Sequence, residues 1–206
     1  MINWLKQFFR KLFRGKGEIK LGIYGPPNTG KTTLANKISE EFTGEELGSV
    51  SEVPHETRVV QKKERVVLEH DGKEISMNLL DMPGISTKVD YKEFMEHDIE
   101  EDEAKVRSKE ATKGIVEAIK WLDNVDAVLV IFDSTKNPYT QVNVTILGNL
   151  EAKDIPIILV ANKTDLEDAE PEKIEEAFPQ YAFTSISAKE GENITDLYSK
   201  IIKHVA

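Results

Sequence analysis

The chain has 206 residues, of which 39% are hydrophobic, so it is long enough for one domain with a packed core. It contains no cysteine, which excludes a disulfide framework and any thiolate-bound zinc or iron–sulfur site, and which fits a reducing cytosol. The net charge of −10 disfavours nucleic acid and anionic membranes, but residues 1–17 carry five cations and no acid, which leaves −15 on the remainder.

Residues 2–14 predict an amphipathic helix, which Gly15 and Gly17 then end. At about 100° per residue the apolar side chains occupy one half of the helical wheel. This half holds Ile2, Trp4, Leu5, Phe8, Phe9, Leu12 and Phe13, and the other half holds Asn3, Lys6, Gln7, Arg10, Lys11 and Arg14. The helix can lie on a membrane, dock in a partner's groove or fold back onto its own domain. We favour the membrane, which predicts a cytoplasmic protein with peripheral membrane association.

From Ile19 onward, segments with strand and helix patterns alternate, which predicts one α/β domain over residues 18–206. Strands are expected at 19–24, 57–70, 73–80, 126–133, 155–161 and 181–186. Helices are expected at 32–42, 105–122, 140–152, 171–178 and 194–205, with an exposed loop at 43–56 and irregular polar chain at 86–104. The apolar strand cores indicate a three-layer fold with a mainly parallel sheet, and the hairpin of the second and third strands adds one antiparallel edge.

The segment between the first strand and the first helix matches the phosphate-binding pattern GxxxxGK[ST]. It reads Gly25-Pro26-Pro27-Asn28-Thr29-Gly30-Lys31-Thr32. The glycines let backbone amides turn inward around a phosphate, and the helix N-terminus adds its dipole. Lys31 would contact the β- and γ-phosphates and Thr32 would bind Mg²⁺. A glycine-rich turn without a ligand is the alternative. The nucleotide-binding residues expected here are Pro27, Asn28, Thr29, Gly30, Lys31, Thr32 and Thr33.

Three shorter motifs each follow a predicted strand, as a nucleotide site at the sheet's carboxyl edge requires. Asp81-Met82-Pro83-Gly84 can serve Mg²⁺ through the aspartate and the γ-phosphate through the Gly84 amide. In Asn162-Lys163-Thr164-Asp165, Asp165 can accept hydrogen bonds from the N1–H and 2-amino groups of guanine, which adenine lacks. Ser187-Ala188-Lys189 can close over the base. Each motif alone is equally an ordinary polar turn.

Together these motifs resemble the Era-like GTPases of the translation-factor-related P-loop class, over residues 19–204. The phosphate loop, continued by Thr33 and Leu34, is similar to that group's G-x-P-N-x-G-K-[ST]-[ST]-L. The segment His55-Glu56-Thr57-Arg58 looks like the end of its switch I. The resemblance implies a Ras-like G domain that binds GTP and GDP with Mg²⁺ and hydrolyses GTP. It implies catalytic roles for Lys31, Thr57 and Gly84, Mg²⁺ binding by Thr32, Thr57 and Asp81, and guanine binding by Asn162, Lys163, Asp165, Ser187, Ala188 and Lys189.

Two positions refine the expected mechanism. Ile85 stands where Ras-like enzymes carry a glutamine that orients water, and Era-like enzymes similarly have an apolar residue there, so we expect slow intrinsic hydrolysis. Asn28 matches an asparagine that helps to ligate K⁺ in potassium-activated relatives, where the cation neutralises charge beside the phosphates. The alternative is that Asn28 tolerates a tight turn.

The expected partners are a guanine nucleotide and a second copy of the chain in a nucleotide-dependent dimer. Era-like proteins commonly end in an RNA-binding KH domain, whereas this sequence has no GXXG-bearing extension after its closing helix, so RNA or ribosome binding is expected by analogy only. We expect residues 43–60 and 84–104 to respond to the γ-phosphate. The seven acids in residues 93–103 favour a solvated mobile loop, and the alternative is a nucleotide-dependent effector surface for a basic partner. The alternatives to a hydrolysing switch are a recruiting module with little turnover and a ribosome-assembly GTPase.

Overall fold

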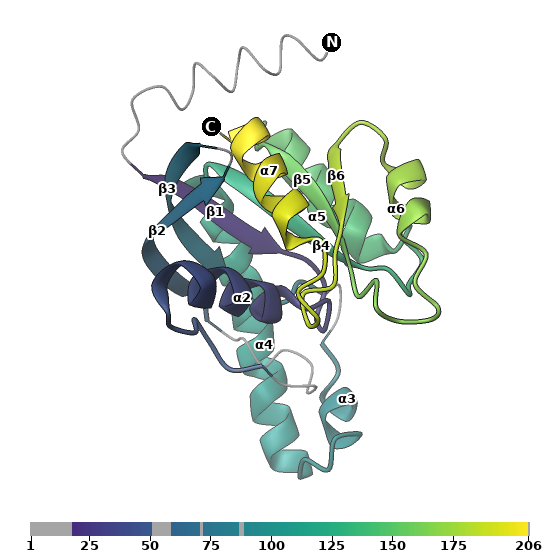
Figure 1. Ribbon diagram of the computed structural model, residues 1–206. Helices are drawn as coiled ribbons and strands as arrows, with labels where there is room; N and C mark the ends of the chain where they lie inside the picture. Colours follow the sequence, from purple (N-terminus) through teal and green to yellow (C-terminus); the bar gives the residue numbers. More distant parts are fainter. Residues whose placement is uncertain (1–17, 51–58, 71, 87–88, 206) are drawn as a thin grey trace.

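The computed structural model describes residues 18–50, 59–70, 72–86 and 89–205. These form a six-stranded sheet in the order β2-β3-β1-β4-β5-β6, with helices on both faces (Figure 1). The predicted helix at residues 2–14 and the predicted Mg²⁺ ligand Thr57 lie outside the described residues. None of the described helices combines the length and the apolar character that a transmembrane span requires.

The strands and helices follow each other almost as the sequence predicts. The strands are β1 Ile19–Tyr24, β2 Gln61–His70, β3 Lys73–Asp81, β4 Ala127–Asp133, β5 Ile157–Asn162 and β6 Ala182–Ser185. The helices are α2 Lys31–Thr43, α3 Tyr91–Met95, α4 Glu101–Trp121, α5 Gln141–Ala152, α6 Pro171–Ala177 and α7 Ile194–Val205, and a single 3₁₀ turn, η1 Leu122–Asn124, follows α4. All strand pairs are parallel except β2–β3, which confirms the predicted antiparallel edge.

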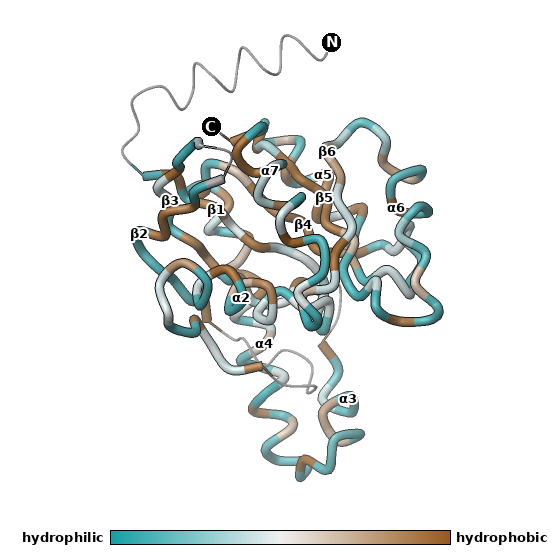
Figure 2. The backbone as a smooth tube through the Cα atoms, viewed as in Figure 1, coloured by the Kyte–Doolittle hydropathy of each residue, from teal (hydrophilic) through white to brown (hydrophobic). Residues whose placement is uncertain are grey.

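Two hydrophobic clusters hold the helices against the two faces of the sheet. One face packs on α2 and α7 through side chains such as Leu34 and Leu197. The other packs on α4, α5 and α6 through Ala118, Leu147 and Ile174. Because side chains of successive strand residues point to opposite faces, strands β4 and β5, which are apolar up to their last residues, contribute to both clusters. Figure 2 shows the hydrophobic strands at the centre of the sheet, and a mixture of hydrophilic and hydrophobic residues at the α3 end.

The prediction that residues 86–104 are irregular is wrong, because α3 and the first turn of α4 lie within this segment. Asp90 caps α3 by accepting a hydrogen bond from the Lys92 amide at 3.1 Å. The acids at the start of α4 interact favourably with the positive end of the helix dipole. Glu101 and Glu103 also form ion pairs with the cations four residues later, as in the 2.6 Å contact of Glu101 with Lys105. The acid run therefore lies partly in α3 and α4 and partly in the turn that joins them.

The segment α3–α4 has a hydrophobic cluster of its own, separate from the two that cover the sheet. Phe94 is fully buried there against Ala104 and Ala111, with partly buried apolar side chains around them. In Figure 1 the α3 end of this pair of helices extends away from the sheet. The cluster explains why α3 forms, since an isolated helix of five residues is unstable in water.

The predicted strand at residues 57–70 begins later, at Gln61. Its antiparallel partner β3 ends at Asp81, which pairs with Gln61, so no partner backbone remains for the described residues Val59 and Val60. The register also shifts between Lys63 and Val66, where Arg65 has a φ of 55°. Such a bulge twists an edge strand and disfavours pairing with another chain.

Candidate functional site

The phosphate loop joins the end of β1 to the start of α2 in a compact turn. Gly30 has a φ of 88°, and a Cβ atom there would lie 2.3 Å from the Asn162 amide nitrogen. Gly25 is equally confined, since a Cβ atom would lie 2.4 Å from the Ile131 carbonyl oxygen. Both glycines are therefore required by close approach to the neighbouring strands. Asn28 is exposed with a φ of 58°, so the turn alone accounts for an asparagine there.

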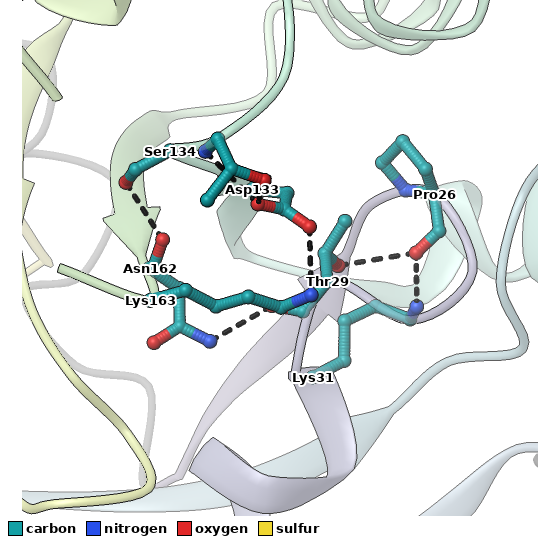
Figure 3. Close-up of polar contacts among 8 residues, drawn as sticks. Pro26, Thr29, Lys31, Asp133, Ser134, Asn162 and Lys163 are labelled. Carbon is teal, nitrogen blue, oxygen red and sulfur yellow. Dashed lines mark hydrogen bonds and ion pairs between the residues drawn. The ribbon is translucent and has the colours of Figure 1, made fainter. Parts of the chain in front are cut away.

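Lys31 lies inside the curve of this loop. Its ammonium group donates a hydrogen bond to the Pro26 carbonyl oxygen at 2.6 Å, and the Thr29 hydroxyl donates to the same oxygen at 3.1 Å (Figure 3). The side chain is buried, and burial lowers the pKa of Lys31 to about 8, although Asp81 opposes the shift. A desolvated ammonium group at a helix N-terminus is well placed to bind a phosphate.

The predicted Mg²⁺ residues Thr32 and Asp81 lie together. The Thr32 hydroxyl donates to Asp81 Oδ2 at 2.6 Å, because β1 and β3 are adjacent and Ile23 pairs with Asp81. A hydroxyl and a carboxylate are the hard oxygen donors that Mg²⁺ prefers, with water and phosphate completing its shell. The described residues contain no group of three or more His, Cys, Asp or Glu side chains that could hold a metal alone. The donor set thus fits a cation bound together with a nucleotide.

The chain after Asp81 passes directly beside the phosphate loop. The Ile85 amide donates to the Gly25 carbonyl oxygen at 3.1 Å. A Cβ atom on Gly84 would lie 3.0 Å from Pro27 Cα, so glycine permits this approach. The Ile85 side chain is buried in the cluster that covers the α4 face of the sheet. Its apolar side chain therefore serves packing and offers no hydrogen bond to a water molecule.

Asn162 connects the phosphate loop to both predicted guanine loops. Its amide donates to the Thr29 carbonyl oxygen at 2.8 Å, and its side-chain oxygen accepts a hydrogen bond from the Ala188 amide at 2.9 Å. The residue is only 3% exposed, so both bonds lie in a medium where losing either is costly. Asn162 thus fastens three segments that are distant in the sequence.

Asp165 and Ser187 are also brought together. The Ser187 hydroxyl donates to Asp165 Oδ1 at 2.6 Å, and Asp165 is exposed. Lys189, by contrast, is exposed, and its ammonium group lies 3.7 Å from Glu190. The structure therefore groups the predicted residues at Asn162, Asp165, Ser187 and Ala188, whereas the Lys189 ammonium group lies beside Glu190.

Sequence reasoning missed Asp133 and Ser134 at the end of β4. Asp133 Oδ2 lies 2.6 Å from the Lys163 ammonium nitrogen, and the Ser134 hydroxyl donates to the Asn162 carbonyl oxygen at 2.6 Å (Figure 3). Burial opposes ionisation of Asp133, but hydrogen bonds from Lys163 and Thr135 outweigh it and hold the pKa of this carboxyl below its usual value. A polar residue directly after a buried strand is the signal that was available.

A separate cleft of about 550 Å³ lies between the chain after β4 and helix α6. It contains none of the predicted site residues. Its walls are formed by residues 135–139 and by Glu170, Lys173, Glu176 and Ala177.

Comparison with known proteins agrees with this geometry. The family model described as 50S ribosome-binding GTPase matches residues 20–163. GTPase Era of Alkaliphilus oremlandii is 30% identical over 190 residues, which cover 89% of this chain and 54% of that protein. The tRNA modification GTPase MnmE of a Synechococcus strain is 29% identical over 202 residues, which cover 97% of this chain and 37% of that protein.

Solved structures of Era share the fold. A variant of Aquifex aeolicus Era bound to GDP and aluminium fluoride has a TM-score of 0.68 at 21% identity, covering 91% of this chain and 56% of that one. The chain spans about half or less of the length of these relatives. Since the family model covers most of the sequence, and the predicted Era-like resemblance is confirmed, the chain belongs to the 50S ribosome-binding GTPase family.

Proposed function

We propose that the chain binds GTP with Mg²⁺, hydrolyses it slowly to GDP and phosphate, and acts as a molecular switch of the Era-like type. The observation that carries this proposal is the pair of hydrogen bonds made by Asn162, which ties the phosphate loop at Thr29 to the guanine loop at Ala188. A phosphate site and a base site held at a fixed separation suit one nucleotide. Fluorescent GDP and ADP titrations test it; equal affinity for both would contradict the proposal.

Magnesium is proposed from the contact between Thr32 and Asp81, whose oxygens are suited to this cation beside the β- and γ-phosphates. Thr57 is proposed as a further ligand from the resemblance only. Removal of Mg²⁺ with EDTA should accelerate GDP release, because the cation bridges protein and phosphate.

Slow hydrolysis is proposed because the buried Ile85 cannot orient an attacking water molecule. K⁺ bound near Asn28 would supply positive charge beside the phosphates and speed hydrolysis. A nucleotide-dependent dimer would make the rate of hydrolysis depend on protein concentration. Single-turnover hydrolysis in KCl and in NaCl, across a range of protein concentrations, tests both ideas. Equal rates throughout would reject them, and no detectable rate in either salt would favour a recruiting module with little turnover.

The basic segment at residues 2–14 is proposed to bring the protein to an anionic membrane surface, which would make a cytoplasmic protein peripherally membrane-bound. Co-sedimentation with anionic liposomes should be lost on deletion of residues 1–17. Identical behaviour of both proteins would instead favour docking on a partner or on the chain's own domain.

Ribosome assembly is a second candidate function. It is favoured by the family model's description and by a solved structure of Era with 16S ribosomal RNA, which is 22% identical to this chain. Co-sedimentation with ribosomal subunits that depends on GTP would support this role.

A further inference from the structure

The ends of β4 and β5 lie side by side, and Asp133 and Lys163 form an ion pair across them. Asp133 pairs with Asn162 in the strand register, so the carboxylate and the next residue's ammonium group meet at 2.6 Å. The Asp133 side chain is only 11% exposed and the Lys163 side chain 30% exposed. From this arrangement we propose that Asp133 is a positioning residue, which holds the Lys163 side chain against the guanine base and thereby slows release of the nucleotide.

Asp133 is itself held in a single orientation. Its other oxygen, Oδ1, accepts hydrogen bonds from the Thr135 amide at 3.0 Å and from the Thr135 hydroxyl at 2.7 Å. One oxygen is thus committed to the turn after β4, and the other is available to Lys163. A carboxylate fixed in this way can direct its partner, since neither rotation nor protonation at neutral pH competes with the pair.

Lys163 has a backbone conformation that is unusual for a residue with a Cβ atom. Its φ is 69°, which lies in the left-handed region, and such conformations persist where the surroundings determine them and often at functional sites. Figure 3 shows its side chain extending from the end of β5 toward Thr29, with the ammonium group at Asp133. The methylene groups therefore lie between the loop that is proposed to hold guanine and the phosphate loop.

The consequence for binding follows from how lysine side chains contact flat ligands. The apolar stem can cover a base while the charged end remains bound elsewhere. With its ammonium group held by Asp133, the stem needs no further ordering when the nucleotide binds, which favours a long-lived complex. Without Asp133 the stem would have to be ordered on each binding event, and most of the change would appear in the dissociation rate. This inference rests on the proposed guanine site.

The test is the release of fluorescently labelled GDP from the full chain, measured by stopped flow with excess unlabelled GDP. Asp133→Asn should accelerate release on the order of tenfold. The matched control is Asp123→Asn, which removes an exposed ion pair with Lys153 at 2.5 Å and should leave release unchanged. Equal release rates for wild type and Asp133→Asn would overturn the inference, whereas failure of the wild type to bind GDP would overturn the proposed function instead.

A purely structural ion pair would give a different pattern. If Asp133 acts through Lys163, the double variant Asp133→Asn/Lys163→Met should release GDP no faster than Lys163→Met alone. Effects that multiply would mean that Asp133 acts independently of Lys163, and would reject the positioning role. The melting temperature of nucleotide-free Asp133→Asn should stay within about 3 °C of wild type. A larger fall with no change in release would assign the pair to stability alone.

Thr135→Val provides a milder variant in case Asp133→Asn does not fold. It removes the hydroxyl that orients Asp133 Oδ1 but keeps the amide bond and the side-chain shape. Release should be about two- to threefold faster than in wild type. An unchanged rate in this variant, with Asp133→Asn unfolded, would also overturn the inference.

Discussion

The two ends of the proposed nucleotide site are built differently. At the guanine end, the phosphate loop and the chain after β4, β5 and β6 are tied together by buried side-chain hydrogen bonds, with Asn162 at the centre. At the phosphate end, the Thr32 hydroxyl donates to Asp81, and the backbone amide of Ile85 donates to the Gly25 carbonyl oxygen. A base-reading end needs to be fixed before binding, whereas a phosphate-sensing end must change between GTP and GDP.

The largest effect is expected from replacing the hydrogen-bond acceptor that is proposed to contact the guanine base with a donor. Asp165→Asn would replace a carboxylate that accepts two hydrogen bonds with an amide that presents a donor toward the guanine 2-amino group. GDP affinity should fall by about a thousandfold or more, and xanthosine diphosphate, which has an oxygen at that position, should bind better than GDP. Calorimetric titration with both nucleotides measures the change.

Asp168→Asn is the control for this substitution, because Asp168 is exposed near the same loop. An unchanged preference for GDP in Asp165→Asn would mean that the guanine end does not read the base through this carboxylate.

The second prediction concerns the rigidity of the guanine end. Asn162→Ala removes the partners of the Thr29 carbonyl and the buried Ala188 amide, so the free energy of unfolding should fall by about 2–4 kcal/mol. Urea denaturation without nucleotide measures this. Asn149→Ala, which breaks only a surface bond to Thr145 within α5, should change stability far less. Equal losses of unfolding free energy in Asn162→Ala and Asn149→Ala would contradict the proposed rigidity of the guanine end.

A smaller effect is expected at the phosphate end. Thr32→Val removes the hydroxyl proposed to bind Mg²⁺, so GDP release should be about tenfold faster and should no longer depend on Mg²⁺. Stability should change less than in Asn162→Ala. Thr112→Val, which loses only a hydroxyl bonded within α4, is the control. Release that stays sensitive to EDTA would show that Thr32 is not a ligand.

The smallest effect is a pH dependence that arises from Lys31. Its pKa of about 8 means that the ammonium group is lost as the pH rises, and a phosphate binds the charged form. GDP affinity should therefore fall about fourfold between pH 7 and 8.5. Lys31→Ala should bind weakly but with a flat profile over that range. A flat profile in the wild type would mean that the buried Lys31 stays charged.

Burial of Lys31 has the opposite effect on the pH dependence of folding stability. Because the folded protein holds the charged Lys31 less favourably than the unfolded chain does, unfolding free energy without nucleotide should rise as the pH increases from about 8 toward 10.5.

The parts of the molecule that sequence predicted well are those with local rules. The phosphate loop is predictable because its motif lies between a strand and a helix. Strands β4 and β5 are predictable because their residues are apolar up to the last one. Helix α3 was missed because its stability depends on contacts of Phe94 with Ala104 and Ala111, beyond the range of local periodicity.

Side-chain roles were harder to predict than positions. Asp133 ends a strand as Asp81 does, yet its importance depends on the pairing of β4 with β5, which the local sequence around Asp133 does not reveal. Lys189 shows the converse. It belongs to a recognised motif, but its exposed side chain lies beside Glu190. A motif indicates where the backbone goes, while pairing across the sheet decides which side chains meet.

The pair of helices α3 and α4 has a mechanical consequence. Helix α4 contains 21 residues and is therefore about 30 Å long. Its C-terminal part is fixed to the sheet, where the Tyr24 hydroxyl donates to the Ala118 carbonyl oxygen at 3.0 Å. A rotation of about 10° about that end would move the α3 tip by about 5 Å, as follows from the length of the helix. Because only residues 85–90 separate Gly84 from α3 in the sequence, a small displacement beside the phosphate loop would be amplified at the tip, as by a lever.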